Sequence, residues 1–189
     1  MRKRPNRPID DSIYDNAVSV GLEPSALDTP ERIIEYCRQA GYVEGFSTDI
    51  RKLIEDTPGL SLSFEDLGEN DAYIKKINDN CFHIAINSKH PPVRQKFSMA
   101  HEYIHFQFHR DSIDSMPEGE KILHRNEERD WKEYQANKAA AEILMPYDYF
   151  VEIVRQNGGD ISRIASSFGV STLSVRFRAK ELGFGGHGF

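Results

Sequence analysis

The sequence predicts an α+β fold in which a small antiparallel sheet precedes a pair of long helices and a smaller helical subdomain follows them. Three observations predict this fold. Short apolar runs separated by turn residues lie within 60–87, stretches without Gly or Pro lie at 94–109 and 127–145, and glycines separate two helical patterns after residue 157. The 189 residues suffice for one substantial core with a small additional unit.

The composition is that of an ordinary globular protein: 39% of the residues are hydrophobic, 29% are charged, and the formal net charge is −6. No segment approaches the roughly eighteen apolar residues of a membrane span, and the basic start of the chain has no apolar region behind it. Cys37 and Cys81 are too few for a disulfide scaffold and are expected to be reduced. We therefore expect a cytoplasmic protein without a membrane partner.

The first part of the chain is predicted to be an N-terminal extension followed by two helices. Residues 1–27 have a basic start and no clear periodicity. Thr29 and Pro30 suit the N-cap and the first position of a helix that runs to Gly41. A second helical stretch is expected over 48–56.

Three strands are expected next. The first, Leu60–Phe64, alternates between apolar and polar residues. The other two, Ala72–Ile77 and Cys81–Asn87, flank Asn78-Asp79-Asn80, a sequence typical of a hairpin turn. We expect the three strands to form a small antiparallel sheet directly before the helix at 94–109.

The helix predicted over 94–109 carries the most informative motif, because residues 101–105 read His-Glu-Tyr-Ile-His. Histidines four residues apart lie on one helix face, so His101 and His105 can reach the same metal ion. Glu102 projects beside them toward a water that the metal would activate. The motif therefore predicts two zinc ligands and a general base. The helix itself is predicted from apolar residues at helical spacing: Phe97, Ala100, Ile104 and Phe108.

A third ligand is needed, and the local candidate is His109. It lies about 12 Å further along the helix axis than His101, because each residue adds about 1.5 Å to a helix. Imidazoles spaced in this way cannot easily converge on one ion. We therefore interpret His109 as a solvated or packing side chain, and we expect the third ligand on another helix.

A second long helix is predicted over 127–145, where strong helix formers are followed by a proline. Glu133 on this helix is the preferred third ligand. Asn137 follows it by one turn, so Asn137 is expected to hydrogen-bond a ring nitrogen of a ligating histidine. The small residues 139–141 would let the two helices pack closely. Two other acidic residues of this helix are alternative ligands: Glu128 and Glu142.

Two segments of the chain, Arg94–Glu102 and Glu133–Pro146, closely resemble the ImmA/IrrE metallopeptidases. The resemblance covers about residues 30–183. The chain departs from the commoner pattern at Tyr103-Ile104, where a Leu-Gly pair is frequent in the family. Because two long motifs occur in the family's order, the resemblance is specific.

The resemblance implies a zincin-like catalytic core with the activity of a gluzincin-like zinc endopeptidase, for which Mn²⁺ is an alternative metal. Carried over by position, His101, His105 and Glu133 become the zinc ligands. Glu102 becomes the general base. Enzymes of this family typically cleave a partner repressor, so we expect a helix-turn-helix (XRE-type) transcriptional repressor or an antitoxin-like protein, encoded nearby, as the substrate.

Three residues are candidates for stabilising the tetrahedral oxyanion opposite the zinc: His124, Tyr134 and Tyr147. His124 lies within residues 110–126, which are predicted to form a loop between the two motif helices. The sequence does not choose among the three side chains.

The C-terminal part of the chain predicts a helix-turn-helix-like pair. Asp160 opens a helix over Ile161–Phe168, and Gly169 ends it. Ser171 caps a second helix that runs to about Leu182. Four basic residues are candidates for contact with nucleic acid or a protein partner: Arg163, Arg176, Arg178 and Lys180. Alternatively, the pair packs on the core and its basic face contacts an acidic partner.

Together these predictions divide the chain into an extension (1–27), a zinc metallopeptidase core (28–147), a helix-turn-helix-like subdomain (148–183) and a flexible Gly-rich tail (184–189). Two functions are open: a zinc endopeptidase, or a non-proteolytic zinc-stabilised regulator that binds DNA or protein. Glu102 favours the endopeptidase, because a purely structural zinc site needs no carboxylate between its histidines.

Overall fold

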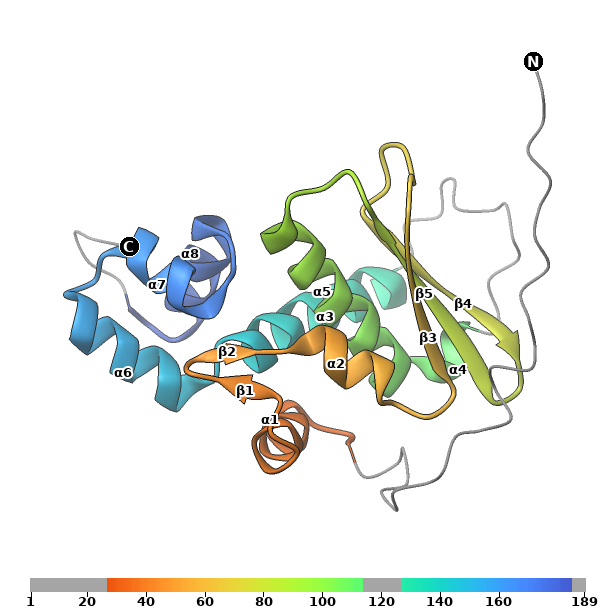
Figure 1. The fold of residues 1–189 in the computed structure, drawn as a ribbon, viewed down its shortest axis with the longest axis horizontal. Helices are drawn as coiled ribbons and strands as arrows, with labels where there is room; N and C mark the ends of the chain where they lie inside the picture. Colours follow the sequence, from red (N-terminus) through yellow and green to blue (C-terminus); the bar gives the residue numbers. More distant parts are fainter. Residues whose placement is uncertain (1–26, 114–126, 185–189) are drawn as a thin grey trace.

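The computed structural model of the chain describes residues 27–113 and 127–184 (Figure 1). The predicted N-terminal extension and C-terminal tail lie outside these residues, apart from Leu27 and Phe184. The three-stranded sheet lies at one end of the molecule, the two long helices over residues 92–108 and 127–144 cross its middle, and the shorter helices of residues 147–181 lie at the other end. Every helix within the described residues is too short or too polar to span a membrane.

The elements before the helix that carries residues 101–105 include both helices and strands: α1 (Pro30–Gln39), β1 (Val43–Glu44), β2 (Ser47–Thr48), α2 (Ile50–Glu55), β3 (Leu60–Glu65), β4 (Ala72–Asn78) and β5 (Cys81–Asn87). The elements after β5 are helices: α3 (Pro92–Phe108), α4 (Arg110–Ile113), α5 (Glu127–Leu144), α6 (Tyr147–Asn157), α7 (Ile161–Phe168) and α8 (Thr172–Glu181). The helices and strands predicted from the sequence are confirmed, with small differences at their ends.

The three-stranded sheet has the order β3-β5-β4. β4 and β5 form the predicted hairpin, but β3 runs parallel to β5, so the prediction of a wholly antiparallel sheet was wrong. β5 occupies the centre because it is the most apolar of the three strands. Its residues Phe82, Ile84 and Ile86 are at most 2% exposed, and a strand paired on both sides is best suited to such burial.

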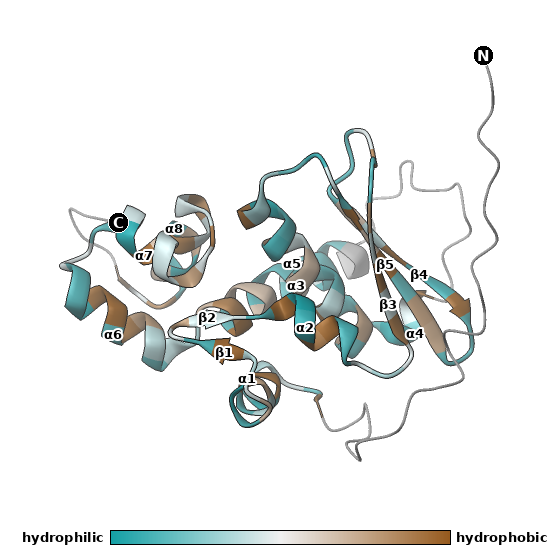
Figure 2. Ribbon diagram, viewed as in Figure 1, coloured by the Kyte–Doolittle hydropathy of each residue, from teal (hydrophilic) through white to brown (hydrophobic). Residues whose placement is uncertain are grey.

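Three parts of the observed structure were not predicted. β1 and β2 form a hairpin whose strands are too short to show alternation in the sequence. α4 lies where a loop was expected. α6 buries Phe150 and Ile153, which are three residues apart, and Figure 2 shows that it carries both apolar and hydrophilic turns. That spacing is a helical signal that the sequence does contain.

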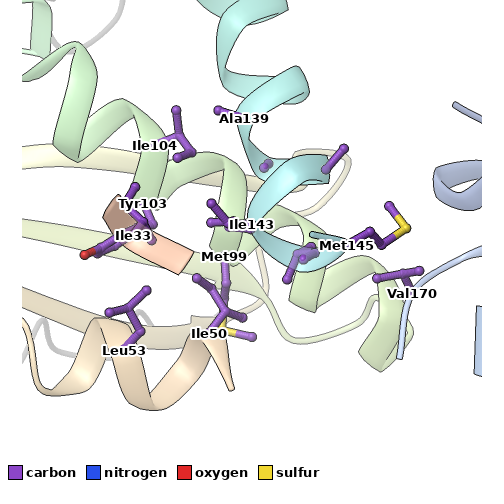
Figure 3. Close-up of a cluster of buried hydrophobic side chains, with 14 of the residues drawn as sticks. Ile33, Ile50, Leu53, Met99, Tyr103, Ile104, Ala139, Ile143, Met145 and Val170 are labelled. Carbon is purple, nitrogen blue, oxygen red and sulfur yellow. The ribbon is translucent and has the colours of Figure 1, made fainter. Parts of the chain in front are cut away.

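α3 lies in the middle of the molecule, where it packs on β5, β4 and α2 and also on α5. Tyr103 and Ile104, which replace the commoner Leu-Gly pair, are both fully buried. Figure 3 shows Ile104 close to Ala139 of α5, inside a cluster of apolar side chains. The larger side chains at these two positions are therefore part of the core and do not disturb the helix that carries the motif.

The C-terminal helix pair has the predicted caps. Asp160 accepts a hydrogen bond from the backbone N–H of Arg163 at the start of α7, and Ser171 accepts one from that of Ser174 at the start of α8. Gly169 ends α7 with a φ of 65°, a conformation that favours glycine. α7 and α8 pack on each other, α8 also packs on α5, and α7 packs on β2. The pair is therefore docked on the core.

A half-buried lysine joins this helix pair to the core. Lys96 of α3 donates hydrogen bonds to Ser47 Oγ of β2 (2.6 Å) and to the carbonyl oxygen of Phe168 at the end of α7 (2.7 Å). Burial lowers the pKa of the Lys96 amine to about 8, although the Asp49 carboxylate acts in the opposite direction.

The contribution of Lys96 to stability is expected to rise with pH while only the unfolded chain holds its proton. The amine titrates near 10.4 in an unfolded chain and at about 8 in the folded protein. Between these values the contribution of Lys96 to the free energy of unfolding should increase by about 2 kcal/mol, after allowance for partial solvent exposure. Lys96→Met should lack this increase. Urea unfolding of both proteins at several pH values measures the difference between their free energies of unfolding. Cysteines and tyrosines that titrate in the same pH range contribute equally to both proteins, so their contributions cancel in this difference.

The exposed Lys89 provides the matched control for this experiment. Lys89→Met should show the same pH response as the wild type. An equal pH response of Lys96→Met and the wild type would contradict the assignment of the rise to Lys96.

Candidate metal centre

The candidate centre lies where α3 and α5 pack together. Small residues of α5 make the close approach possible, because Ala136 and Ala140 are fully buried. This packing brings Glu133 of α5 to the face of α3 that carries His101 and His105. The sequence prediction of a close two-helix contact is confirmed.

Three side chains converge between the helices. The Nε2 atoms of His101 and His105 lie 3.0 Å apart. Glu133 places Oε2 at 3.2 Å from His101 Nε2, and Oε1 at 3.6 Å from His105 Nε2. Donor atoms about 2.0–2.1 Å from a tetrahedral zinc ion lie about 3.3 Å from each other, so these side chains fit such an ion. Among the described residues they are the only group of three or more His, Cys, Asp or Glu side chains close enough to share a metal.

The charges of the three side chains are complementary. Hydrogen bonds with His101 and His105 hold the pKa of the Glu133 carboxyl well below its usual range, against the effect of burial. Burial lowers the pKa of His101, but the Glu133 and Glu102 carboxylates together raise it overall. Glu133 is therefore ionised at neutral pH, as a cation ligand must be.

Asn137 holds the ring of His101 in place. Its Oδ1 lies 3.1 Å from Nδ1 of His101, which is the hydrogen bond that the four-residue spacing from Glu133 predicted. An amide oxygen can only accept a hydrogen bond, so the His101 ring carries its proton on Nδ1. In a neutral ring that ligates a metal ion, this arrangement leaves the lone pair of Nε2 for the ion.

Glu102 lies on α3 directly beside the cluster. It is 9% exposed, and its charge is close enough to raise the pKa of His101. Its carboxylate is not among the three groups that converge on the metal position. The carboxylate of Glu102 is therefore buried close to the cluster without being one of its converging groups.

His109 was interpreted as a solvated or packing side chain, and the structure supports packing, because His109 is buried and is not one of the three converging groups. It is 6% exposed, and its Nδ1 lies 3.0 Å from His105 Nδ1. Its Nε2 lies 3.0 Å from Oε1 of Gln135 on α5. The contact with His105 could have been found from the four-residue spacing on one helix face. Nothing in the sequence indicated Gln135.

Two predicted site residues lie elsewhere in the fold. Glu142, an alternative ligand, has its Oε2 3.8 Å from Nη1 of Arg178. Arg178, a candidate for nucleic-acid contact, is 3% exposed and donates a hydrogen bond to the carbonyl oxygen of Met145 (3.2 Å). Its Nη1 is also 3.6 Å from Glu181 Oε2. Arg178 is therefore an interior residue and not the surface residue that the prediction requires, because its guanidinium interacts with groups inside the fold.

The other three basic candidates of the C-terminal pair, Arg163, Arg176 and Lys180, are exposed. Arg163 is partly neutralised, because its Nε lies 3.5 Å from Asp160 Oδ2. A role of these residues in binding nucleic acid or a protein stays a prediction.

Two of the three oxyanion candidates are described by the structure. Tyr134 is 49% exposed, with its ring 5.8 Å from that of Trp131 (between centroids), and Tyr147 is 61% exposed at the start of α6. His124 and the side chain of Glu128 lie outside the described residues. The oxyanion role stays a prediction for all three candidates.

Both cysteines are free, as expected. Cys37 is buried, and burial raises the pKa of its thiol to about 12. Cys81 is not part of the cluster of potential ligands. Neither thiol takes part in the candidate centre.

Comparison with known proteins places the chain in a recognised group. A family model described as the IrrE N-terminal-like domain, of the M78 peptidases, matches residues 55–180, which include the whole cluster. Among the matching solved structures is a Mycobacterium tuberculosis transcriptional regulator, with a TM-score of 0.61 and 19% identity over 90% of this chain. The chain spans 50% of that protein, and this likeness shows a shared fold. No match was found among curated proteins.

Proposed function

The chain belongs to the M78 peptidase family of IrrE N-terminal-like domains, and we propose that it is a zinc-dependent endopeptidase. We further propose that its substrate is an XRE-type helix-turn-helix repressor or an antitoxin-like protein encoded nearby. The family supports a metallopeptidase or a related regulator, and the residues of the site favour the peptidase.

The buried carboxylate of Glu102 is the observation that carries the proposal. Three groups already converge to hold a metal ion, so Glu102 is not needed as a ligand. The side chain of Glu102 is 9% exposed and its charge acts on His101, so the carboxylate lies close to the metal ligands. A carboxylate in this position is suited to exchanging a proton with a metal-activated water.

In the proposed reaction, a zinc ion held by His101, His105 and Glu133 would polarise the scissile carbonyl and make a water acidic enough to attack it. Glu102 accepts the proton of the attacking water and then donates it to the leaving amine. Asn137 keeps the His101 ring in its ligating orientation throughout.

The second candidate function is a non-proteolytic regulator that uses a metal for stability. Two observations favour it: the structural neighbour is named a transcriptional regulator, and the helices α7 and α8 carry exposed basic residues. A purely structural site, however, gains nothing from Glu102. We therefore rank the regulator second.

The test is to incubate the purified protein, with Zn²⁺ or Mn²⁺, with the product of its neighbouring gene. The peptidase proposal expects a defined cut by the wild type and no cut by metal-free protein or Glu102→Gln. Binding of the neighbouring product or of DNA by a metal-loaded wild type that never cuts would favour the regulator.

A further inference from the structure

The two histidines of the cluster differ in what holds the ring nitrogen that faces away from the metal position. Each turns Nε2 toward the other ligands, so each must place its Nδ1 elsewhere. His101 Nδ1 meets the amide oxygen of Asn137. His105 Nδ1 meets another imidazole, that of His109, at 3.0 Å.

The backbone explains how His109 reaches this position. It is the C-cap residue of α3, and its N–H donates to the carbonyl oxygen of His105 (2.9 Å). This helical hydrogen bond keeps His109 one turn beyond His105 on the same face. The centroids of the two rings are 5.0 Å apart, with an interplanar angle of 54°.

A metal at Nε2 of His105 determines where every proton of this contact lies. A neutral imidazole that ligates through Nε2 carries its proton on Nδ1, so His105 donates to Nδ1 of His109. His109 must then accept at Nδ1 and carry its own proton on Nε2. That proton is donated to Oε1 of Gln135, at 3.0 Å. Each contact thus has one donor and one acceptor.

We propose that His109 is a positioning residue for the metal centre, which holds the His105 ring in its ligating tautomer and orientation through the chain His105–His109–Gln135. This inference rests on the metal centre of the proposed function. His109 is 6% exposed, so little water is available to replace its nitrogen as the acceptor. Removing such a partner of a metal-ligating histidine typically weakens metal affinity about 10- to 100-fold.

The same observations allow a second explanation, in which His109 merely fills space at the end of α3. The two explanations differ in what they require of the side chain. Packing needs a ring of the right size, and Phe supplies one. Positioning needs an atom that accepts a hydrogen bond from His105, which Gln offers through its amide oxygen and Phe lacks.

The experiment compares the zinc affinity of wild type, His109→Phe and His109→Gln by competition with a chelator. We expect His109→Phe to bind zinc about 10- to 100-fold more weakly and His109→Gln to recover most of the loss. Gln107→Ala is the control on the same helix, since Gln107 donates to the Tyr103 hydroxyl and not to the cluster. Its zinc affinity should equal that of the wild type. Thermal unfolding of each metal-free protein separates a loss of stability from a loss of affinity.

Nitrogen NMR of the histidine rings in the zinc-loaded wild type tests the proton positions directly. The proposal expects a protonated Nδ1 on His105 and a protonated Nε2 on His109. A proton on Nδ1 of His109, or equal zinc affinity of wild type and His109→Phe, would overturn it. A wild type that binds no zinc would instead overturn the proposed function, so the two failures are distinguishable.

Discussion

Glu102→Gln is expected to abolish peptide hydrolysis while zinc remains bound. Gln has nearly the size of Glu but cannot accept the proton of the attacking water, so the loss falls on the chemical step. General-base catalysis typically contributes about 10²- to 10⁴-fold, and we expect kcat to fall by at least about 10³-fold. Zinc affinity should change little, because Glu102 is not one of the three converging groups. Cleavage of the partner protein and chelator competition measure the two quantities.

Glu152→Gln supplies the matched control for this substitution. Glu152 is an exposed residue of α6 that pairs with Gln156 (2.8 Å), and its replacement should leave cleavage unchanged. Wild-type cleavage rates in Glu102→Gln would rule out the assigned base, whereas a parallel loss of zinc would point to a ligand role for Glu102.

Glu133→Ala is expected to weaken zinc binding by about 10²- to 10³-fold. Protein zinc sites bind with about 10 kcal/mol or more in total, so loss of one of three protein ligands should cost several kcal/mol. Activity should be lost with the metal. The melting temperature of the wild type should rise when zinc is added, because the ion binds the folded state. The variant should show little of this rise at the same zinc concentration.

Asp130→Asn tests whether any acidic residue of α5 has this effect. Asp130 lies on the same helix but is exposed, so zinc should stabilise this variant as it does the wild type. Undiminished zinc affinity in Glu133→Ala would show that the third ligand comes from elsewhere.

The parts of the fold that the sequence predicted are those governed by local chemistry. Asp160 and Ser171 cap their helices because their side chains accept hydrogen bonds from N–H groups two or three residues away. The contact between Asn137 and His101 followed from the four-residue spacing between Glu133 and Asn137, since that spacing puts both on one helix face. The helix caps span one turn and do not depend on the rest of the chain, whereas the contact of Asn137 with His101 also requires α5 to pack on α3.

Two of the failures concern relations that the tertiary fold decides. Whether β3 joins the sheet parallel or antiparallel depends on which strand becomes central, and the chain between strands does not determine this. Arg178 was predicted to contact nucleic acid or a protein partner as one of four basic residues of the C-terminal helix pair, but it is 3% exposed. Its position three residues after the buried Val175 placed it on the inner face of α8, but its partner Glu142 is 36 residues away in sequence. The partner of a buried charge is therefore hard to predict from local pattern.

α5 has contacts at its C-terminal end that tie the metal centre to the rest of the protein. The helix carries Glu133 near its middle, while the carbonyl oxygen of Ile143 accepts a hydrogen bond from Thr48 Oγ1 (3.1 Å) and Glu142 faces Arg178 of α8. Local unfolding of α5 would break all of these contacts together. A metal ion bound at Glu133 would stabilise α5 and therefore also raise the free energy needed to unfold its C-terminal end. We therefore expect the metal centre and the α7–α8 pair to unfold as one cooperative unit.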